Sequence, residues 1–243
     1  MKIQGRTFLI SGGSRAAPPS STSSRRAAPL AILDMNEELA ATLVAEYPKS
    51  TKFFQANVLE TESIAAAVKG SLAWIKETGY GLGRGVAAAG VSSPAKIIDR
   101  NGNPFSLDDF DFVMNVNVRG TIDLIRQTLP HLTTVTPVGP EGERGVLIIV
   151  DLGAIASLTL PLTRDLARYG VRAVTIAPSL FRSNMTAMMS DKVRGSLERV
   201  MEFPKREGQP EEFSALVKHA VENVMLNGTV LRLDGGMRMP SKM

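Results

Sequence analysis

The stretch from Gly145 to Pro178 constrains the fold of this chain more than any other. It opens with an unbroken apolar run, Val146–Val150, which is typical of a strand buried on both faces. A segment of helical length follows, and Gly170 stands where the C-terminal cap of a helix belongs. The next segment, Val171–Pro178, is rich in β-branched residues and predicts a second strand. Strand, helix and strand in this order predict a parallel βαβ unit. The helical segment carries leucines four apart: Leu158, Leu162 and Leu166.

The rest of the chain repeats the alternation of strands and helices. Further strands are expected at Thr7–Ile10, Leu30–Leu33, Thr51–Ala56, Gly85–Gly90 and Thr229–Leu233. Further helices are expected at Glu37–Tyr47, Glu60–Thr78, Leu107–Leu129 and Glu211–Met225, with a polar segment of helical character at Phe181–Glu207. The expected fold is α/β, a Rossmann-like doubly wound parallel sheet in three α/β/α layers, and its 243 residues fit a single domain.

Composition excludes several kinds of site. The chain has no cysteine, so disulfides, thiolate metal sites and a cysteine nucleophile are excluded. Its two histidines, His131 and His219, argue against a multi-histidine metal centre. A net charge of +4 spread along the chain, with 5% aromatic residues, gives no reason to expect a nucleic-acid surface.

No membrane span or export signal is expected. The apolar window Val146–Thr163 holds one charge, Asp151, but Gly153, Pro161 and the flanking strand pattern favour a buried α/β core over a membrane helix. The apolar part of Met1–Ser11 is too short for a secretory signal, so the expected compartment is the cytoplasm.

The ends of the first two strands carry a nucleotide-binding pattern. Ser11, Gly12 and Gly13 follow the first strand at once, and such a turn lets the backbone approach a pyrophosphate. Asp34 ends the second strand, where a carboxylate binds the ribose 2′-hydroxyl and favours NAD over NADP. The alternative is that Asp34 only opens a turn.

Small residues also end the fourth strand, where Ala89 and Gly90 offer a surface for a planar ligand. The long helix that follows contains Asn117 and Gly120, against local helix propensity. Such breaks mark either function or a close packing contact, and the sequence leaves both possibilities open.

The segment Arg15–Pro29 lacks the amphipathic helix that should follow the glycine turn. Its adjacent prolines and its serines predict an irregular or disordered loop. Serine codons of the TCN type, read one base early, become apolar codons. Ser20–Ser24 would then regain an apolar pattern, so we hypothesise an out-of-frame reading, which transcript sequencing tests.

Together these motifs resemble the short-chain dehydrogenase/reductase family, in its 3-hydroxyacyl-CoA and hydroxysteroid dehydrogenase branch. The resemblance covers most of the chain and rests on Gly12–Gly13, Asp34, Ala87–Gly90, Val116–Thr121, Leu160–Arg172, Ile176–Pro178 and Val230–Gly235. It implies an NAD-dependent oxidoreductase that acts on an acyl-CoA, a steroid or another secondary alcohol or ketone, and a homo-oligomer, either a dimer or a tetramer.

The resemblance also implies individual roles. Asn117 corresponds to the active-site asparagine, which supports a water-linked proton relay. Asn57 and Val58 correspond to the pair that meets the adenine. Pro178 and Ser183 fall in the motif beside the nicotinamide, and Ser179 replaces the glycine that usually follows the proline.

One departure from the family bears on activity. The family transfers hydride with Tyr-x-x-x-Lys and an upstream serine, in which the lysine lowers the pKa of the tyrosine. No tyrosine of this chain has a lysine four residues later. Val150 passes to Gly153 through Asp151 and Leu152 alone, so the catalytic segment is absent, and a lone aspartate does not reproduce it.

The sequence therefore leaves three functions open. The first is an NAD(H) oxidoreductase of this branch, impaired or inactive. The second is a nucleotide-binding or subunit-pairing paralogue without redox activity. The third is a repurposed enzyme that catalyses a non-redox step.

Overall fold

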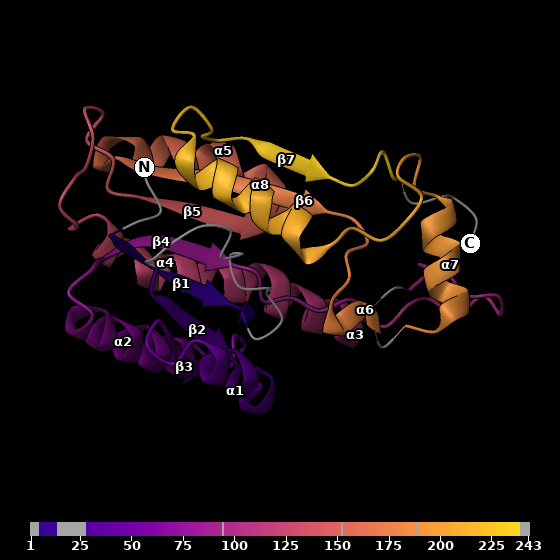
Figure 1. Ribbon diagram of the computed structural model, residues 1–243. Coiled ribbons are helices and arrows are strands. Elements are labelled where there is room, and N and C mark those ends of the chain that lie inside the picture. Colours follow the sequence, from indigo (N-terminus) through magenta and orange to yellow (C-terminus); the bar gives the residue numbers. More distant parts are fainter. Residues whose placement is uncertain (1–4, 14–27, 94, 152, 188, 239–243) are drawn as a thin grey trace.

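The computed structural model describes residues 5–13, 28–93, 95–151, 153–187 and 189–238. Its centre is a seven-stranded sheet with the order β3-β2-β1-β4-β5-β6-β7, in which every neighbouring pair is parallel (Figure 1). The strands are β1 (Arg6–Ser11), β2 (Leu30–Asp34), β3 (Thr51–Gln55), β4 (Gly81–Ala87), β5 (Gly145–Val150), β6 (Val171–Pro178) and β7 (Val230–Leu233). The order reverses between β1 and β4, which makes the sheet doubly wound as predicted.

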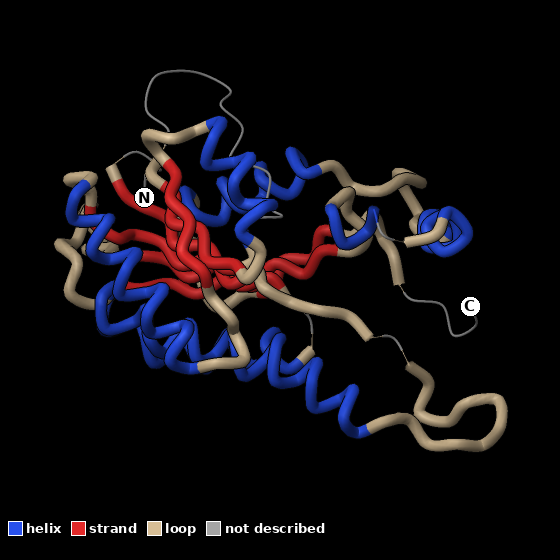
Figure 2. The backbone as a smooth tube through the Cα atoms, turned by 90° about the horizontal axis from the view of Figure 1, so that it is seen from below, coloured by secondary structure: helices blue, strands red, loops and turns tan. Residues whose placement is uncertain are grey.

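Helices cover both faces of the sheet (Figure 2). They are α1 (Glu37–Glu46), α2 (Thr61–Glu77), α3 (Leu107–Met114), α4 (Thr121–Leu132), α5 (Ala154–Leu166), α6 (Asn184–Ala187), α7 (Asp191–Arg199) and α8 (Pro210–Glu222). Helices α2, α4 and α5 share one apolar core with the sheet, through side chains such as Ile64, Leu124 and Ile155. Helices α1 and α8 share the second core on the opposite face, through Leu43 and Val221. The three-layer α/β/α architecture is confirmed.

The predicted βαβ unit is β5, α5 and β6. A short 3-10 turn, Ala167–Tyr169, ends at Gly170, whose φ of +66° is the left-handed cap conformation. Of the three leucines, Leu166 is buried in the core and Leu162 packs against it, whereas Leu158 is 40% exposed. The buried face also carries Thr159, whose hydroxyl lies 2.6 Å from that of Thr175 on β6.

The helix expected at Leu107–Leu129 differs in two ways. Residues Asn115–Gly120 form a π-helical turn between α3 and α4. The expectation that the helix stops before Pro130 is wrong, since α4 continues to Leu132 with Pro130 inside it. Pro130 lies in the last turn, where it removes a single backbone donor, and Thr133 N still donates to Leu129 O at 3.0 Å.

The fourth strand also has different bounds from those expected. It begins at Gly81 rather than Gly85 and ends at Ala87, before the small residues that follow. Its early part pairs with β1, where a Cβ on Gly83 would lie 2.7 Å from the Arg6 Cβ. Glycine is therefore needed here to admit the Arg6 side chain.

The amino-terminal edge of the sheet contains buried charges. Arg172 Nε donates to Glu143 Oε1 at 2.8 Å, and both side chains are 7% exposed. The guanidinium of Arg84 lies 4.5 Å from the centre of the Phe8 ring, and burial lowers the pKa of Arg84 to about 10. These contacts join strands and the end of α8, so we assign them to the fold.

The irregular segment predicted at Arg15–Pro29 falls outside the described residues except for Ala28 and Pro29, which are buried. No described helix is long and apolar enough to cross a membrane. The apolar window Val146–Thr163 divides between β5 and α5.

Candidate functional site

The residues predicted to bind a cofactor lie where strands end. Because all seven strands are parallel, their carboxyl ends share one edge of the sheet, where doubly wound folds bind ligands. The residues at or just after strand ends are Ser11, Gly12, Gly13, Asp34, Asn57, Val58, Ala89, Gly90 and Pro178. The structure therefore brings the predicted set to one edge, centred on the reversal between β1 and β4.

The glycine turn after β1 contacts the end of β4 closely. Gly12 has a φ of +68°, and a Cβ there would lie 2.7 Å from Ala89 N and 2.8 Å from the Ala88 carbonyl. Ser11 Oγ accepts hydrogen bonds from Ala88 N at 3.3 Å and Ala89 N at 3.4 Å. The backbone after β1 and the backbone after β4 therefore pack directly against each other at the switch point, and a glycine is needed at Gly12 for this close approach.

Asp34 ends β2 and accepts a hydrogen bond from Asn36 N at 3.0 Å through one carboxylate oxygen. This bond is the Asx turn that the sequence left open as an alternative role. The turn holds the carboxylate at the strand end, beside the start of α1.

The side-chain amide of Asn57 forms hydrogen bonds with residues that directly precede α2. Its nitrogen donates to Glu60 Oε1 at 2.7 Å, and its oxygen accepts from Leu59 N at 3.1 Å. Val58 lies against Gly120, where a Cβ would come within 2.9 Å of the Val58 side chain. Gly120 is thus needed for packing, and it fixes the loop that ends in Val58.

Asn117 holds the segment that follows β4. Its Oδ1 accepts from Val91 N at 2.8 Å, and its Nδ2 donates to Val91 O at 2.9 Å. The side-chain amide therefore fixes the backbone of Val91 through both its oxygen and its nitrogen. π-Turns often occur at functional sites. Sequence reasoning missed Val91, because a residue that contributes only backbone atoms carries no side-chain signal.

Ser183 begins α6 beyond β6. Its Oγ accepts from Thr186 N at 3.2 Å, and its own nitrogen donates to Thr186 Oγ1 at 2.9 Å. Ser183 follows Pro178, the last residue of β6, by five residues, and its Oγ also lies 3.3 Å from Thr186 Oγ1, where either hydroxyl could be the donor.

The joint between β5 and α5 is very short. β5 ends at Val150, α5 begins at Ala154, and Leu152 lies outside the described residues. Asp151 N donates to Ile176 O at 3.2 Å, so β5 stays paired with β6 up to the joint. The tyrosines Tyr47, Tyr80 and Tyr169 precede β3, β4 and β6 by at most four residues, which places all three at the opposite, amino-terminal edge.

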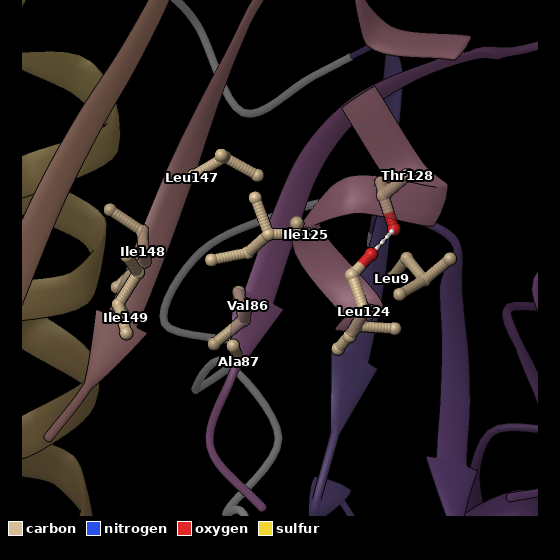
Figure 3. Close-up of a pocket in the computed structure, with 10 residues that line it drawn as sticks. Leu9, Val86, Ala87, Leu124, Ile125, Thr128, Leu147, Ile148 and Ile149 are labelled. Carbon is tan, nitrogen blue, oxygen red and sulfur yellow. Dashed lines mark hydrogen bonds between the residues drawn. The ribbon is translucent and has the colours of Figure 1, made fainter. Parts of the chain in front are cut away.

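The described residues also line a void and a groove away from these strand ends. A void of about 10 Å³ lies between the sheet and α4 (Figure 3), and apolar side chains line it. Its one hydroxyl, Thr128 Oγ1, already donates to Leu124 O at 2.8 Å, so a water would find too few partners. An open groove of about 450 Å³ follows the outer side of the π-turn and α4.

Asp123 lies at this groove and joins α4 to α2. Burial raises the pKa of Asp123, but hydrogen bonds from Thr61, Arg126 and Gln127 outweigh it and lower the pKa overall. Among the described residues no cluster of histidine, aspartate and glutamate is suited to hold a metal ion.

The sequence matches no protein-family model. It is 33% identical to 3-hydroxyacyl-CoA dehydrogenase type-2 of Mus musculus, over 98% of this chain and 97% of the mouse protein. It is 29% identical to the protein of the same name from Drosophila melanogaster, over 98% and 99% of the two chains. It is 28% identical to the acetoacetyl-CoA reductase of Synechocystis, over 74% of this chain and 76% of that protein.

Solved structures agree with these relatives. The crystal structure of 3-hydroxyacyl-CoA dehydrogenase type-2 from Mycobacterium avium superposes with a TM-score of 0.86 at 25% identity, over 99% of this chain and 98% of that chain. A short-chain type dehydrogenase/reductase from Mycobacterium ulcerans gives a TM-score of 0.81 at 19% identity, which supports the fold alone. The alignment with the mouse protein spans 258 positions, more than the 243 residues of this chain. Within the aligned region the mouse protein therefore has residues that this chain lacks.

Proposed function

The chain belongs to the short-chain dehydrogenase/reductase family, and we propose that it binds NAD(H) at the carboxyl edge of its sheet but transfers hydride very slowly. Its relatives are dehydrogenases and reductases by name, and a nicotinamide cofactor follows from that family. The binding part rests on the glycine turn at Gly12, which lies at the switch point of the sheet, and on Asp34 at the end of β2. The carboxylate favours NAD over NADP, because it would repel a 2′-phosphate.

The position of the tyrosines supports the loss of activity most directly. A strand of four to eight residues spans about 13–26 Å, and the three tyrosines stand before strands rather than after them. None can reach a substrate at the carboxyl edge, so no phenol acts there as general acid. A positioned general acid or base contributes about 10²–10⁴-fold to rate, and that factor is what this chain would lose.

The residues present can still perform binding and positioning. When bound, NAD(H) supplies the hydride chemistry. The glycine turn would hold the pyrophosphate and Asp34 the adenosine ribose, and Asn117 would fix the chain at Val91 beside the nicotinamide. The substrate class carried over from the relatives is a 3-hydroxyacyl-CoA, a hydroxysteroid or a similar secondary alcohol or ketone.

A homo-oligomer, dimer or tetramer, belongs to the same proposal. Helix α3 has no buried residue, although it carries Leu107, Phe110 and Phe112, which are 70%, 45% and 48% exposed. Apolar surface of this kind favours association. Sedimentation equilibrium tests it, and a monomer at micromolar concentration would contradict this part.

Two assays with the mouse relative as reference test the proposed function. We expect NADH fluorescence to saturate on titration. We expect NADH oxidation with acetoacetyl-CoA to be slower than in the mouse protein by about 10²–10⁴-fold. Turnover at the rate of the mouse protein would refute the loss of activity, and no NADH binding would refute the binding function.

Grafting the absent catalytic segment into this chain tests whether oxidoreductase activity can be restored. A segment that carries the family's upstream serine and its Tyr-x-x-x-Lys motif is inserted between Val150 and Gly153. If the absent segment alone limits the rate, turnover should recover; a graft that folds and binds NADH without turnover would show a second defect.

A further inference from the structure

The sequence contains two Asn-Gly pairs, Asn101–Gly102 and Asn227–Gly228. In such a pair the glycine nitrogen can attack the asparagine side chain, because glycine has no Cβ to hinder the approach. Both asparagines are exposed, so access to water does not distinguish the two sites. The two sites differ in how their reacting groups are hydrogen-bonded.

Both reacting groups of Asn227–Gly228 are bound to β6. Asn227 Oδ1 accepts a hydrogen bond from Ala173 N at 3.0 Å, and Gly228 N donates to Ala173 O at 2.8 Å. Ala173 is completely buried in the core of the sheet. The side-chain carbonyl and the attacking nitrogen are therefore held on separate atoms of a core strand, and the reaction requires both bonds to open.

Asn101–Gly102 forms the tip of a hairpin that leads into α3 and lies away from the sheet (Figure 2). The hairpin is closed by a bridge between Ile98 and Pro104. Its tip is organised by Asp99, whose Oδ1 accepts from Asn101 N at 2.7 Å and from Asn103 N at 2.9 Å. The side-chain amide of Asn101 makes no hydrogen bond within the part of the chain that the structure describes, so its carbon is open to attack.

The attacking nitrogen of Gly102 is also held less firmly than that of Gly228. It donates only within its own turn, to Asp99 O, and the distance is 3.3 Å against 2.8 Å for Gly228 N. No atom lies within 4 Å of the place where a Cβ on Gly102 would be, so neighbouring groups do not restrict the turn. Exposed loop tips of this kind open locally at a lower free energy than core strands.

We propose that Asn101 is a site of deamidation and that the fold protects Asn227 from the same reaction. Gly102 N bonds to Asn101 Cγ, the bond from Cγ to Nδ2 breaks, and the amide leaves as ammonia with the proton from the glycine nitrogen. Water then opens the cyclic succinimide at either carbonyl. Opening at Cγ gives aspartate, and opening at the backbone carbonyl gives isoaspartate, whose main chain is longer by one carbon.

Either product changes the hairpin. An aspartate at position 101 adds a negative charge next to Asp99, whose carboxylate already accepts the hydrogen bonds that organise the tip. Isoaspartate shifts Asn103 relative to that carboxylate. Both products lower the net charge of the chain, so ion-exchange chromatography separates them from the unmodified protein.

Peptide mapping by mass spectrometry, on folded protein held at mildly alkaline pH, tests the proposal. We expect Asn101 to deamidate about tenfold faster than Asn227, because the reaction at Asn227 requires two hydrogen bonds to open. Incubation in urea that unfolds the chain is the control. There we expect the two rates to agree within about threefold, because neither pair keeps its contacts.

A matched pair of glycine variants tests the mechanism at Asn101. Gly102→Ala should slow the reaction severalfold, because the new Cβ hinders the attack by the nitrogen. Gly79→Ala should leave the rate unchanged, since Gly79 also has a positive φ and no atom within 4 Å of a Cβ but lies far from Asn101 in the sequence.

Three results would overturn the proposal. They are equal rates at the two sites in the folded protein, a faster rate at Asn227, and a preference for Asn101 that persists in urea. Absence of reaction at Asn101 in the folded protein, when it proceeds in urea, would overturn it as well. The test needs no ligand, so its outcome is independent of the proposed NAD(H) site.

Discussion

The contact between Asn117 and Val91 makes a sharp prediction about the variant Asn117→Asp. One oxygen of the new carboxylate can still accept from Val91 N, but the other replaces a donor 2.9 Å from Val91 O. A hydrogen bond worth about 1 kcal/mol is lost, and the Val91 carbonyl is left part-buried opposite an anion, for a total of about 2–3 kcal/mol. In a chain of this length that lowers the melting temperature by about 4–12 °C.

Low pH should restore the stability that Asn117→Asp loses. The facing carbonyl raises the folded-state pKa of the new carboxyl above its unfolded value. The penalty is therefore full above the folded-state pKa and disappears below the unfolded pKa of about 3.9, where a protonated carboxyl donates to Val91 O. Urea unfolding from pH 7 to pH 3 measures this change in stability. Asn115→Asp is the control, since Asn115 is exposed in the same π-turn. Equal destabilisation of both variants, or no dependence on pH, would refute the role of the amide.

Three further predictions concern the cofactor site and its support. Gly12→Ala should abolish NADH binding in a fluorescence titration, because the new Cβ would clash with the backbone of Ala88 and Ala89 after β4. Gly5→Ala is the control, since Gly5 has a φ of +83° but no atom within 4 Å of the place where a Cβ would be, and this variant should bind NADH normally. Equal loss of NADH affinity in both variants would point to backbone strain alone. The protein should bind NADH more tightly than NADPH, and Asp34→Ser should reduce the ratio of the two affinities about tenfold. An unchanged ratio would mean that Asp34 only stabilises the turn after β2. Because the pKa of Asp123 is lowered in the folded state, its carboxylate stabilises the fold above the unfolded pKa of about 3.9, and this stabilisation is lost as pH falls through the folded-state pKa. In Asp123→Asn, the free energy of unfolding measured with urea should therefore depend less on pH between pH 6 and pH 3.

The fold and the cofactor residues were predictable because they depend on local patterns. Apolar runs closed by glycine or aspartate placed the strands, and parallel order then put Gly12 and Asp34 at one edge. The predicted NAD site inherits its location from that order. Its individual contacts remain predictions.

The π-turn was not predictable, because its causes lie far apart in the chain. It depends on Asn117 binding the backbone 26 residues earlier and on Gly120 receiving Val58. The sequence showed only that both residues disfavour a helix. The burial of the Thr159 hydroxyl on α5 was not predictable for a similar reason, since it lies 2.6 Å from the hydroxyl of Thr175, 16 residues later on β6.

The short connection at Asp151 is long enough for the fold of this chain but lacks the residues that the family uses for catalysis. A βαβ unit needs only two to six residues between its strand and its helix, and three residues separate β5 from α5 here. The register of β5 with β6 runs from Gly145 to Val150 without a break, so the sheet does not depend on a longer connection. By the resemblance, the family's tyrosine and lysine belong to that connection, so its absence removes the proton donor and leaves both strands paired. We therefore expect this chain to keep the fold of its relatives and a measurable affinity for NADH while transferring hydride very slowly.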